Sequence, residues 1–306
     1  MHLRNNIAAG IAAVVLMVPV SLPAQDESTF RADTRLVVLH ASVVDGKGNL
    51  ITTLQKDDFK VFENQVPQQV KVFRREDVPV SMGLIIDNSG SMRDKRKKVE
   101  AAALALVKAS NAQDEVLVVN FNDEAYEDVP FTNDIKKMEE GLTKIDSRGG
   151  TAMRDAIDLV IDHIKTKAKK DKKVIFIVTD GNDNTSSVSL EKLVQKAHNS
   201  EIVMYAIGLL SEEEHREEKK AKRALDALTT ASGGLAYYPK DLAEVEKLAL
   251  QVAQDIRNQY IIAYSPSNQT LDGSFRQIKV QTNGRKYNVR TRTGYYASPD
   301  TKRAAN

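Results

Sequence analysis

The stretch that decides the fold covers residues 81–92 and reads Ser-Met-Gly-Leu-Ile-Ile-Asp-Asn-Ser-Gly-Ser-Met. Its first six residues form a short, nearly continuous apolar run, which is typical of a strand buried on both faces. The run ends in Asp87-Asn88-Ser89-Gly90-Ser91, and apolar residues at helical spacing follow from Val99 to Ala109. A buried strand that leads through a polar turn into a helix is the first half of a parallel β-α-β unit.

The same alternation continues to about residue 258. Three further runs rich in Val and Ile are predicted as buried strands, at Glu115 to Phe121, Val174 to Thr179 and Ile202 to Ile207. Helical spacing is found in the segments between and after them, at Ile135 to Ile145, Ala152 to Lys165, Leu190 to His198, Ala221 to Ala231 and Leu242 to Asn258. Such alternation predicts an α/β domain over residues 78–258, with a parallel sheet covered by helices on both sides.

The flanks of this domain, residues 25–77 and 259–297, read as β structure. Phe59 to Phe62 and Val70 to Phe73 alternate apolar with polar residues, as half-buried antiparallel strands do. In the second flank, Asn283-Gly284 is a strong hairpin signal, and the strands on either side of it are expected to form a hairpin. Because a sheet of few strands needs a partner, we expect both flanks to form one β domain into which the α/β domain is inserted.

The two ends of the chain carry their own signals. Residues 1–24 resemble a secretory signal peptide, with an apolar run from Ile7 to Val20 and small residues before a polar stretch. A membrane-spanning helix needs about 20 apolar residues, and this run is shorter. The alternative interpretation is an uncleaved signal anchor. We therefore expect an exported protein, periplasmic or extracellular, with no stable membrane span after signal cleavage. Residues 298–306 are polar and are expected to be disordered.

Composition excludes several classes of protein. The 306 residues include 44 basic and 42 acidic side chains, for a net charge of +2, which argues against nucleic-acid binding. The basic runs Lys95 to Lys98 and Lys165 to Lys173 are interpreted as solvated helix faces. The chain has no cysteine, so disulfides, thiolate metal sites and cysteine nucleophiles are all excluded.

Oxygen-bearing side chains stand where the predicted strands end. Asp87, Ser89 and Ser91 follow the first strand, Thr151 follows a glycine pair before a helix, and Asp180 follows the third strand. Ligand sites of such folds lie at this edge of the sheet, and oxygen ligands suit Mg²⁺, Mn²⁺ or Ca²⁺ rather than zinc. Taken singly, each residue fits another explanation: Thr151 as a helix N-cap with Asp155, and Asp180 as part of a turn. Their joint appearance in this order favours a metal site.

These residues resemble the metal-ion-dependent adhesion site of von Willebrand factor type A (VWA) domains, with Asp87-x-Ser89-x-Ser91, Thr151 and Asp180 all present. The resemblance covers about Pro79 to Asn258 and implies a doubly wound fold with a mostly parallel sheet. It also implies that Ser89 and Ser91 bind the metal directly, Thr151 directly or through water, and Asp87 and Asp180 largely through water. The open position of the metal would take an Asp or Glu of a partner protein.

The flanks extend the resemblance to a bacterial subfamily. The segments Val72-Phe73, Pro79-Val80-Ser81 and Arg290 to Tyr296 look like the exported VWFA-related proteins of Acidobacteria. That subfamily implies an architecture more than a biological role.

Three functions remain open at this point. The leading hypothesis is a non-enzymatic, exported module for adhesion or scaffolding that recognises an acidic residue of an unidentified protein through its metal. The second is a metal-assisted hydrolase, because Asp87 resembles the nucleophile of haloacid-dehalogenase-like phosphatases. However, Ser89 replaces the general-acid aspartate of that family, and the five histidines show no metal-ligand spacing. The third is a scaffold that binds the metal for stability alone.

Overall fold

A computed structural model describes residues 35–143, 147–181, 183–210, 215–284 and 287–299. The described residues form one compact unit, whose largest sheet has six strands in the order β10-β9-β8-β5-β6-β7. These strands are β5 (Val80–Asp87), β6 (Glu115–Phe121), β7 (Ala125–Thr132), β8 (Lys172–Thr179), β9 (Val203–Gly208) and β10 (Ala236–Tyr237). All neighbours are parallel except β6 and β7. The mostly parallel sheet is therefore confirmed.

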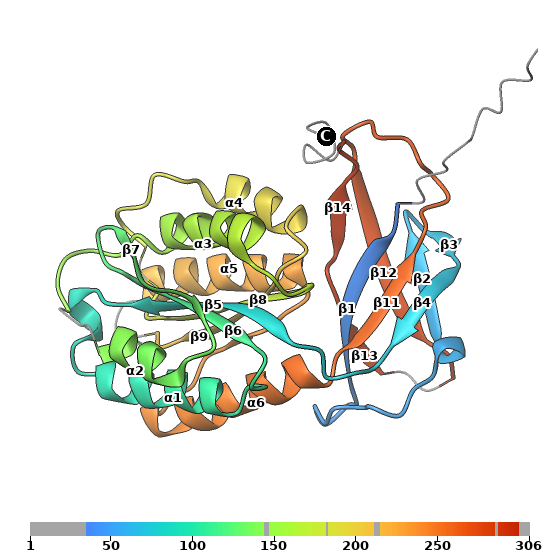
Figure 1. Cartoon of the computed structure of the whole chain (residues 1–306). Helices are drawn as coiled ribbons and strands as arrows, with labels where there is room; N and C mark the ends of the chain where they lie inside the picture. The colour runs from blue at the N-terminus through green and yellow to red at the C-terminus, as the bar shows by residue number, and fades with distance from the viewer. Residues whose placement is uncertain (1–34, 144–146, 182, 211–214, 285–286, 300–306) are drawn as a thin grey trace, which may run out of the picture. The chain divides into compact units, whose positions relative to one another are not determined.

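Helices cover both faces of this sheet (Figure 1). One face packs against α1 (Arg96–Lys108), α2 (Ile135–Thr143) and α6 (Val245–Arg257), and the other against α3 (Met153–Lys167), α4 (Leu190–His198) and α5 (His215–Ser232). Strand β5 is buried along its whole length because both of its faces are covered. Its glycine, Gly83, lets α3 approach closely, since a Cβ there would lie 2.4 Å from Val160 Cγ1.

The direction of winding of the large sheet reverses between β5 and β8. From β5 the chain moves to β6 on one side, whereas β8 lies on the other side of β5 and leads on to β9 and β10. Doubly wound sheets open a crevice at the carboxyl ends of strands where the winding reverses in this way. Asp87 ends β5 and Asp180 follows β8, so both predicted carboxylates lie at this point.

The flanks build two four-stranded antiparallel sheets (Figure 1), with the orders β13-β1-β11-β4 and β14-β12-β2-β3. The strands before the α/β domain are β1 (Val37–Val44), β2 (Phe59–Glu63), β3 (Val66–Gln68) and β4 (Val70–Arg74). Those after it are β11 (Tyr260–Tyr264), β12 (Phe275–Thr282), β13 (Asn288–Arg290) and β14 (Gly294–Tyr296). Each sheet mixes strands from both flanks, and residues of both sheets share one core. The expected β part with an inserted α/β part is confirmed.

The predicted hairpin around Asn283-Gly284 is wrong. Strand β12 pairs with β2 and β14, whereas β13 pairs with β1 in the other sheet. The backbone N–H of Asn283 donates to the carbonyl oxygen of Asp58 at 2.7 Å, so the end of β12 is held by the turn before β2. Because both edges of β12 are already paired, the chain passes to the opposite sheet instead of folding back.

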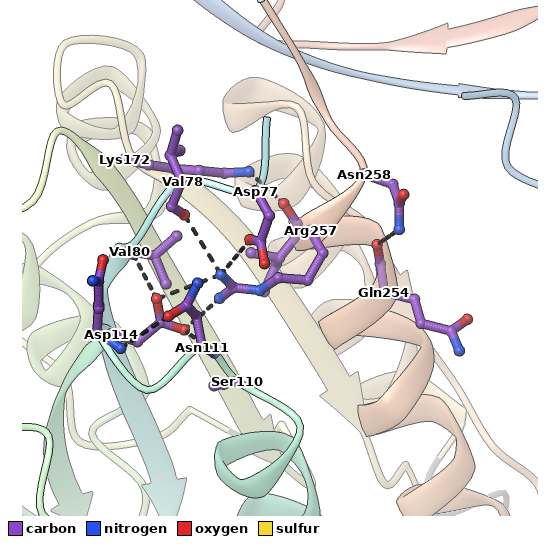
Figure 2. Close-up of polar contacts among 12 residues, drawn as sticks. Asp77, Val78, Val80, Ser110, Asn111, Asp114, Lys172, Gln254, Arg257 and Asn258 are labelled. Carbon is purple, nitrogen blue, oxygen red and sulfur yellow. Dashed lines mark hydrogen bonds and ion pairs between the residues drawn. The ribbon is translucent and has the colours of Figure 1, made fainter. Parts of the chain in front are cut away.

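An ion-pair cluster ties together the linkers that enter and leave the α/β part (Figure 2). Arg257, the last residue of α6, contacts Asp77 of the entering linker at 2.7 Å and Asp114 at 2.5 Å. The side chain of Asp114 is 2% exposed, against 49% for Asp77. Lys172 adds a further bond by donating to the carbonyl oxygen of Ile256. The two linkers are thereby fixed to the body of the α/β part.

A buried polar network continues from the linkers into the β part. Arg290 Nη2 and the Tyr205 hydroxyl both donate to Asp255 Oδ2, at 2.8 and 2.9 Å. Gln259 Nε2 donates to the Tyr205 hydroxyl at 3.1 Å and to Ser42 Oγ at 3.2 Å. Hydrogen bonds between side chains therefore join strands β1, β9 and β13 to helix α6.

His40 on β1 makes the fold sensitive to acid. Burial, followed by the charges of Lys172 and Arg292, lowers the pKa of its imidazole to about 3. The unfolded chain binds a proton near pH 6.5 and the folded chain does not, so stability is lost as the pH falls from 6.5 towards 3. We expect the free energy of unfolding to be about 2 kcal/mol lower at pH 5 than at pH 7 through this residue.

The variant His40→Gln should remove this part of the pH dependence, because glutamine does not titrate. Urea unfolding at pH 5 and pH 7 measures it. An equal drop in stability in the variant and the wild type would contradict the assignment.

The signal peptide predicted at residues 1–24 lies outside the described residues, and so do residues 300–306 of the tail predicted at 298–306. Within the described part, no helix is long and apolar enough to span a membrane.

Candidate metal centre

Asp87 is a fully buried carboxylate at the end of β5. Its Oδ1 accepts the backbone N–H of Ser89 at 2.9 Å, and its Oδ2 accepts the Thr179 hydroxyl at 2.5 Å. The Thr179 hydroxyl in turn accepts the backbone N–H of Gly181 at 2.9 Å. Asp87 is therefore held by both of the loops that follow β5 and β8.

The two serines of the Asp87 loop present their hydroxyls together. Ser89 Oγ lies 3.2 Å from Ser91 Oγ, with Ser89 buried and Ser91 exposed. Between them, Gly90 begins a one-turn 3-10 helix, Gly90–Met92, and the fully buried Met92 anchors that turn in the core. The pair of hydroxyls thus lies on the boundary between the core and solvent.

Thr151 comes to the same edge through a neighbouring loop. The backbone N–H of Gly90 donates to the carbonyl oxygen of Gly149 at 3.3 Å, which joins the Asp87 loop to the one that carries Thr151. Gly149 has φ +75°, a conformation that favours glycine. Thr151 itself is 3% exposed. The N-cap of α3 is Ala152, without a side-chain cap bond, so Thr151 is not a helix cap.

The Thr151 loop is also bound to the loop after β8. The amide oxygen of Asn184 accepts the backbone N–H of Thr151 at 2.9 Å, and the Thr151 carbonyl accepts the backbone N–H of Asn184 at 3.1 Å. Asp155, the capping-box alternative, instead accepts the backbone N–H groups of Ser187 and Val188. Three loops distant in sequence are therefore interlocked at one edge of the sheet.

Asp180 has one carboxylate oxygen paired and the other free. Its Oδ2 accepts from Lys95 Nζ at 3.1 Å, and its side chain is 7% exposed. Its Oδ1 is buried and has no hydrogen-bond partner in the described residues. A buried carboxylate oxygen without a partner is costly, which points to a cation or ordered water at this position.

The charges of Asp87 and Asp180 also favour a cation at this position. Burial and, second, the negative charge of Asp180 raise the pKa of Asp87 to about 6. A divalent cation between the two carboxylates would relieve the repulsion between their negative charges. The described ranges contain no group of three His, Cys, Asp or Glu side chains that could hold a metal ion, so the predicted donor set would consist of two carboxylates and three hydroxyls. Such an all-oxygen set fits a hard cation.

Sequence reasoning missed three residues of this site. Thr179 binds Asp87, and Asn184, which reads in the sequence as a polar turn, holds Thr151. Lys95 was interpreted as part of a solvated helix face, yet its side chain is 23% exposed and pairs with Asp180. Arg96 of the same run is buried, donating to the carbonyl oxygens of Asp87 and Leu142. Only the fold reveals these contacts, because the partners lie up to 92 residues apart in the sequence.

Residues 82–182 match the family model of the von Willebrand factor type A domain. The matched residues run from β5 to the end of β8, about a third of the chain, and they lie in the doubly wound fold that the resemblance implied. No curated protein sequence matches the chain.

Among solved structures, the chain is similar to a von Willebrand factor type A protein from Catenulispora acidiphila. The identity is 15%, the TM-score is 0.50, and the match covers 82% of this chain and 76% of that one. It is also similar to proximal thread matrix protein 1 from the mussel byssus, at 16% identity and a TM-score of 0.50, covering 63% of this chain. The match spans half the length of the byssus protein. At these identities the likeness shows the fold alone.

Proposed function

We propose that the chain is an exported, non-enzymatic binding module that recognises an acidic residue of a partner protein through a divalent cation. The cation is Mg²⁺, or else Mn²⁺ or Ca²⁺, and Asp87, Ser89, Ser91, Thr151 and Asp180 hold it. The buried Oδ1 of Asp180, which has no partner among the described residues and lies beside the point where the winding reverses between β5 and β8, is the observation that carries the proposal.

Each residue has a part that follows from its surroundings. The hydroxyls of the buried Ser89 and the exposed Ser91 are neutral donors, so they would hold a cation without cancelling its charge. The carboxylates of Asp87 and Asp180 supply the negative charge from the buried side. The bound cation would supply a positive point that attracts a carboxylate. An exposed serine hydroxyl at the rim leaves a partner room to approach.

The wider organisation is part of the same proposal. Residues 1–24 act as a signal peptide, residues 25–77 and 259–297 form the β part, and residues 78–258 form the VWA domain. The protein then works in the periplasm or outside the cell.

The test is capture of proteins from an envelope extract by the immobilised chain. Wild-type protein with Mg²⁺ should retain a partner that is released by a chelator. Ser91→Ala is a suitable comparison because Ser91 is exposed and its replacement should leave the fold intact, while capture should fall at least tenfold. Retention that is unchanged by chelator and by Ser91→Ala would contradict metal-bridged recognition.

The same preparation separates the other two hypotheses. A melting temperature that rises with Mg²⁺, with no partner captured at any concentration, would favour a metal-stabilised scaffold. Turnover of phosphate esters that disappears with Asp87→Ala would favour the hydrolase.

A further inference from the structure

Lys95 lies beside the proposed site on the turn that leads into α1. Its ammonium donates to Asp180 Oδ2 at 3.1 Å and to the carbonyl oxygen of Leu209 at 3.2 Å. Leu209 follows β9 and donates its backbone N–H to the carbonyl oxygen of Thr179, so it is next to the loop of Asp180. The ammonium is thus fixed by two acceptors at the same edge of the sheet.

This position leaves the other oxygen of Asp180 for a cation. Lys95 binds Oδ2, whereas Oδ1 is buried and without a partner in the described part of the chain. The lysine therefore orients the carboxylate and at the same time places a positive charge close to where a cation would sit.

The nearby charges determine what this means for a ligand. Asp87 and Asp180 together carry two negative charges, which a divalent cation would cancel. With Lys95 included, these three side chains carry a net charge of about −1 before the cation binds. The net charge of the site is about +1 afterwards. The other charged groups at this edge change the sum little, because Arg96 is paired with Glu100 at 3.4 Å and Asp183 with Arg154 at 3.1 Å, and Asp123 is exposed to solvent.

We infer that Lys95 is a specificity-determining residue: it weakens cation binding and strengthens the binding of an anionic ligand to the loaded site. This inference rests on the proposed function and adds the residue that biases the site towards carboxylates. The trade-off follows from Coulomb's law, since the same positive charge repels the cation and attracts the anion.

A purely structural role for Lys95 predicts a different result. If the lysine serves only to join the loops after β8 and β9, its loss would loosen the site and weaken the binding of both cation and anion. The opposite signs expected for the two ligands therefore separate a charge effect from a tethering effect.

The experiment uses Mn²⁺ as the metal probe and acetate as the carboxylate probe. Water-proton relaxation follows Mn²⁺ binding to the full chain, and acetate is then titrated into the Mn²⁺-loaded protein. Lys95→Gln removes the charge but keeps hydrogen-bond donors, Lys95→Met removes both, and Lys97→Met is the matched control. Lys97 is an exposed residue of the same helix, so its loss changes the net charge equally.

For Lys95→Gln we expect about tenfold tighter Mn²⁺ binding and about fivefold weaker acetate binding than for wild type, a size typical of a partly exposed charge. Lys97→Met should match the wild type in both titrations. Weaker or unchanged Mn²⁺ binding by Lys95→Gln would overturn the inference while leaving the metal site in place. A wild-type chain that binds no Mn²⁺ would overturn the proposed function itself.

Discussion

Asp87→Ala is expected to abolish the stabilisation that Mg²⁺ gives to the wild-type chain. At a Mg²⁺ concentration one hundred times the dissociation constant, that stabilisation amounts to about 2.7 kcal/mol. The variant should show none of it, because Asp87 supplies one of only two carboxylates in the proposed donor set. Denaturant unfolding with Mg²⁺ and with chelator measures the difference.

In the absence of metal, we expect Asp87→Ala to differ little from the wild type in stability. Burial beside Asp180 raises the pKa of Asp87 to about 6, so at pH 7 its charge opposes folding of the metal-free chain. Loss of the carboxylate relieves this repulsion, although it leaves the Thr179 hydroxyl and the Ser89 N–H without their acceptor. We therefore expect a change of about 1 kcal/mol or less without metal. Asp94→Ala, at an exposed residue, is the control and should keep the full response to Mg²⁺.

Arg257→Met is expected to lower the free energy of unfolding by about 3 kcal/mol or more, with or without metal. The substitution leaves Asp114, 2% exposed, as a buried charge without its cation. Asp114 keeps the backbone N–H groups of Val80 and Asn111, which soften the loss but do not cancel it. Thermal or urea unfolding of the full chain measures the effect.

Asp77, the second ion-pair partner of Arg257, provides the control for this prediction. Asp77→Ala removes the other contact of Arg257, but the Asp77 side chain is 49% exposed and its ion pair is screened by water. That variant should lose less than about 1 kcal/mol. Equal losses for Arg257→Met and Asp77→Ala would mean that Asp114 is not the residue that makes the arginine important.

Much of the fold could be predicted from the sequence because its buried strands are so uniform. Strand β5 is buried throughout and mostly apolar, so its pattern differs from the apolar–polar alternation of a half-exposed strand. Strand β7 was not predicted, because it is an antiparallel edge strand in which Val129 is the only fully buried residue. The Asn283-Gly284 turn misled for another reason: its type depends on local residues, whereas the pairing of β12 depends on distant strands.

Of the candidate site, only the residues that would donate oxygen ligands could be predicted from the sequence. The oxygen-bearing side chains of Asp87, Ser89, Ser91, Thr151 and Asp180 follow strands or precede a helix, and a parallel sheet gathers such positions at one edge. Whether they hold a metal stays a prediction. Lys95 and Thr179 could not be assigned, because a lysine in a basic run and a threonine inside a strand give no local sign of their partners.

The pairing of β1 with β11 and β13 has a mechanical consequence. Tension applied between Arg35 and Pro299 would be carried by hydrogen bonds between strands of the two flanks, which resist shear directly. The inserted α/β part lies outside that path, since its entry and exit are joined through Arg257 and Asp77. A force applied at the carboxyl ends of the strands of the large sheet would instead pass through the linkers, so the ion pairs of Arg257 would bear it.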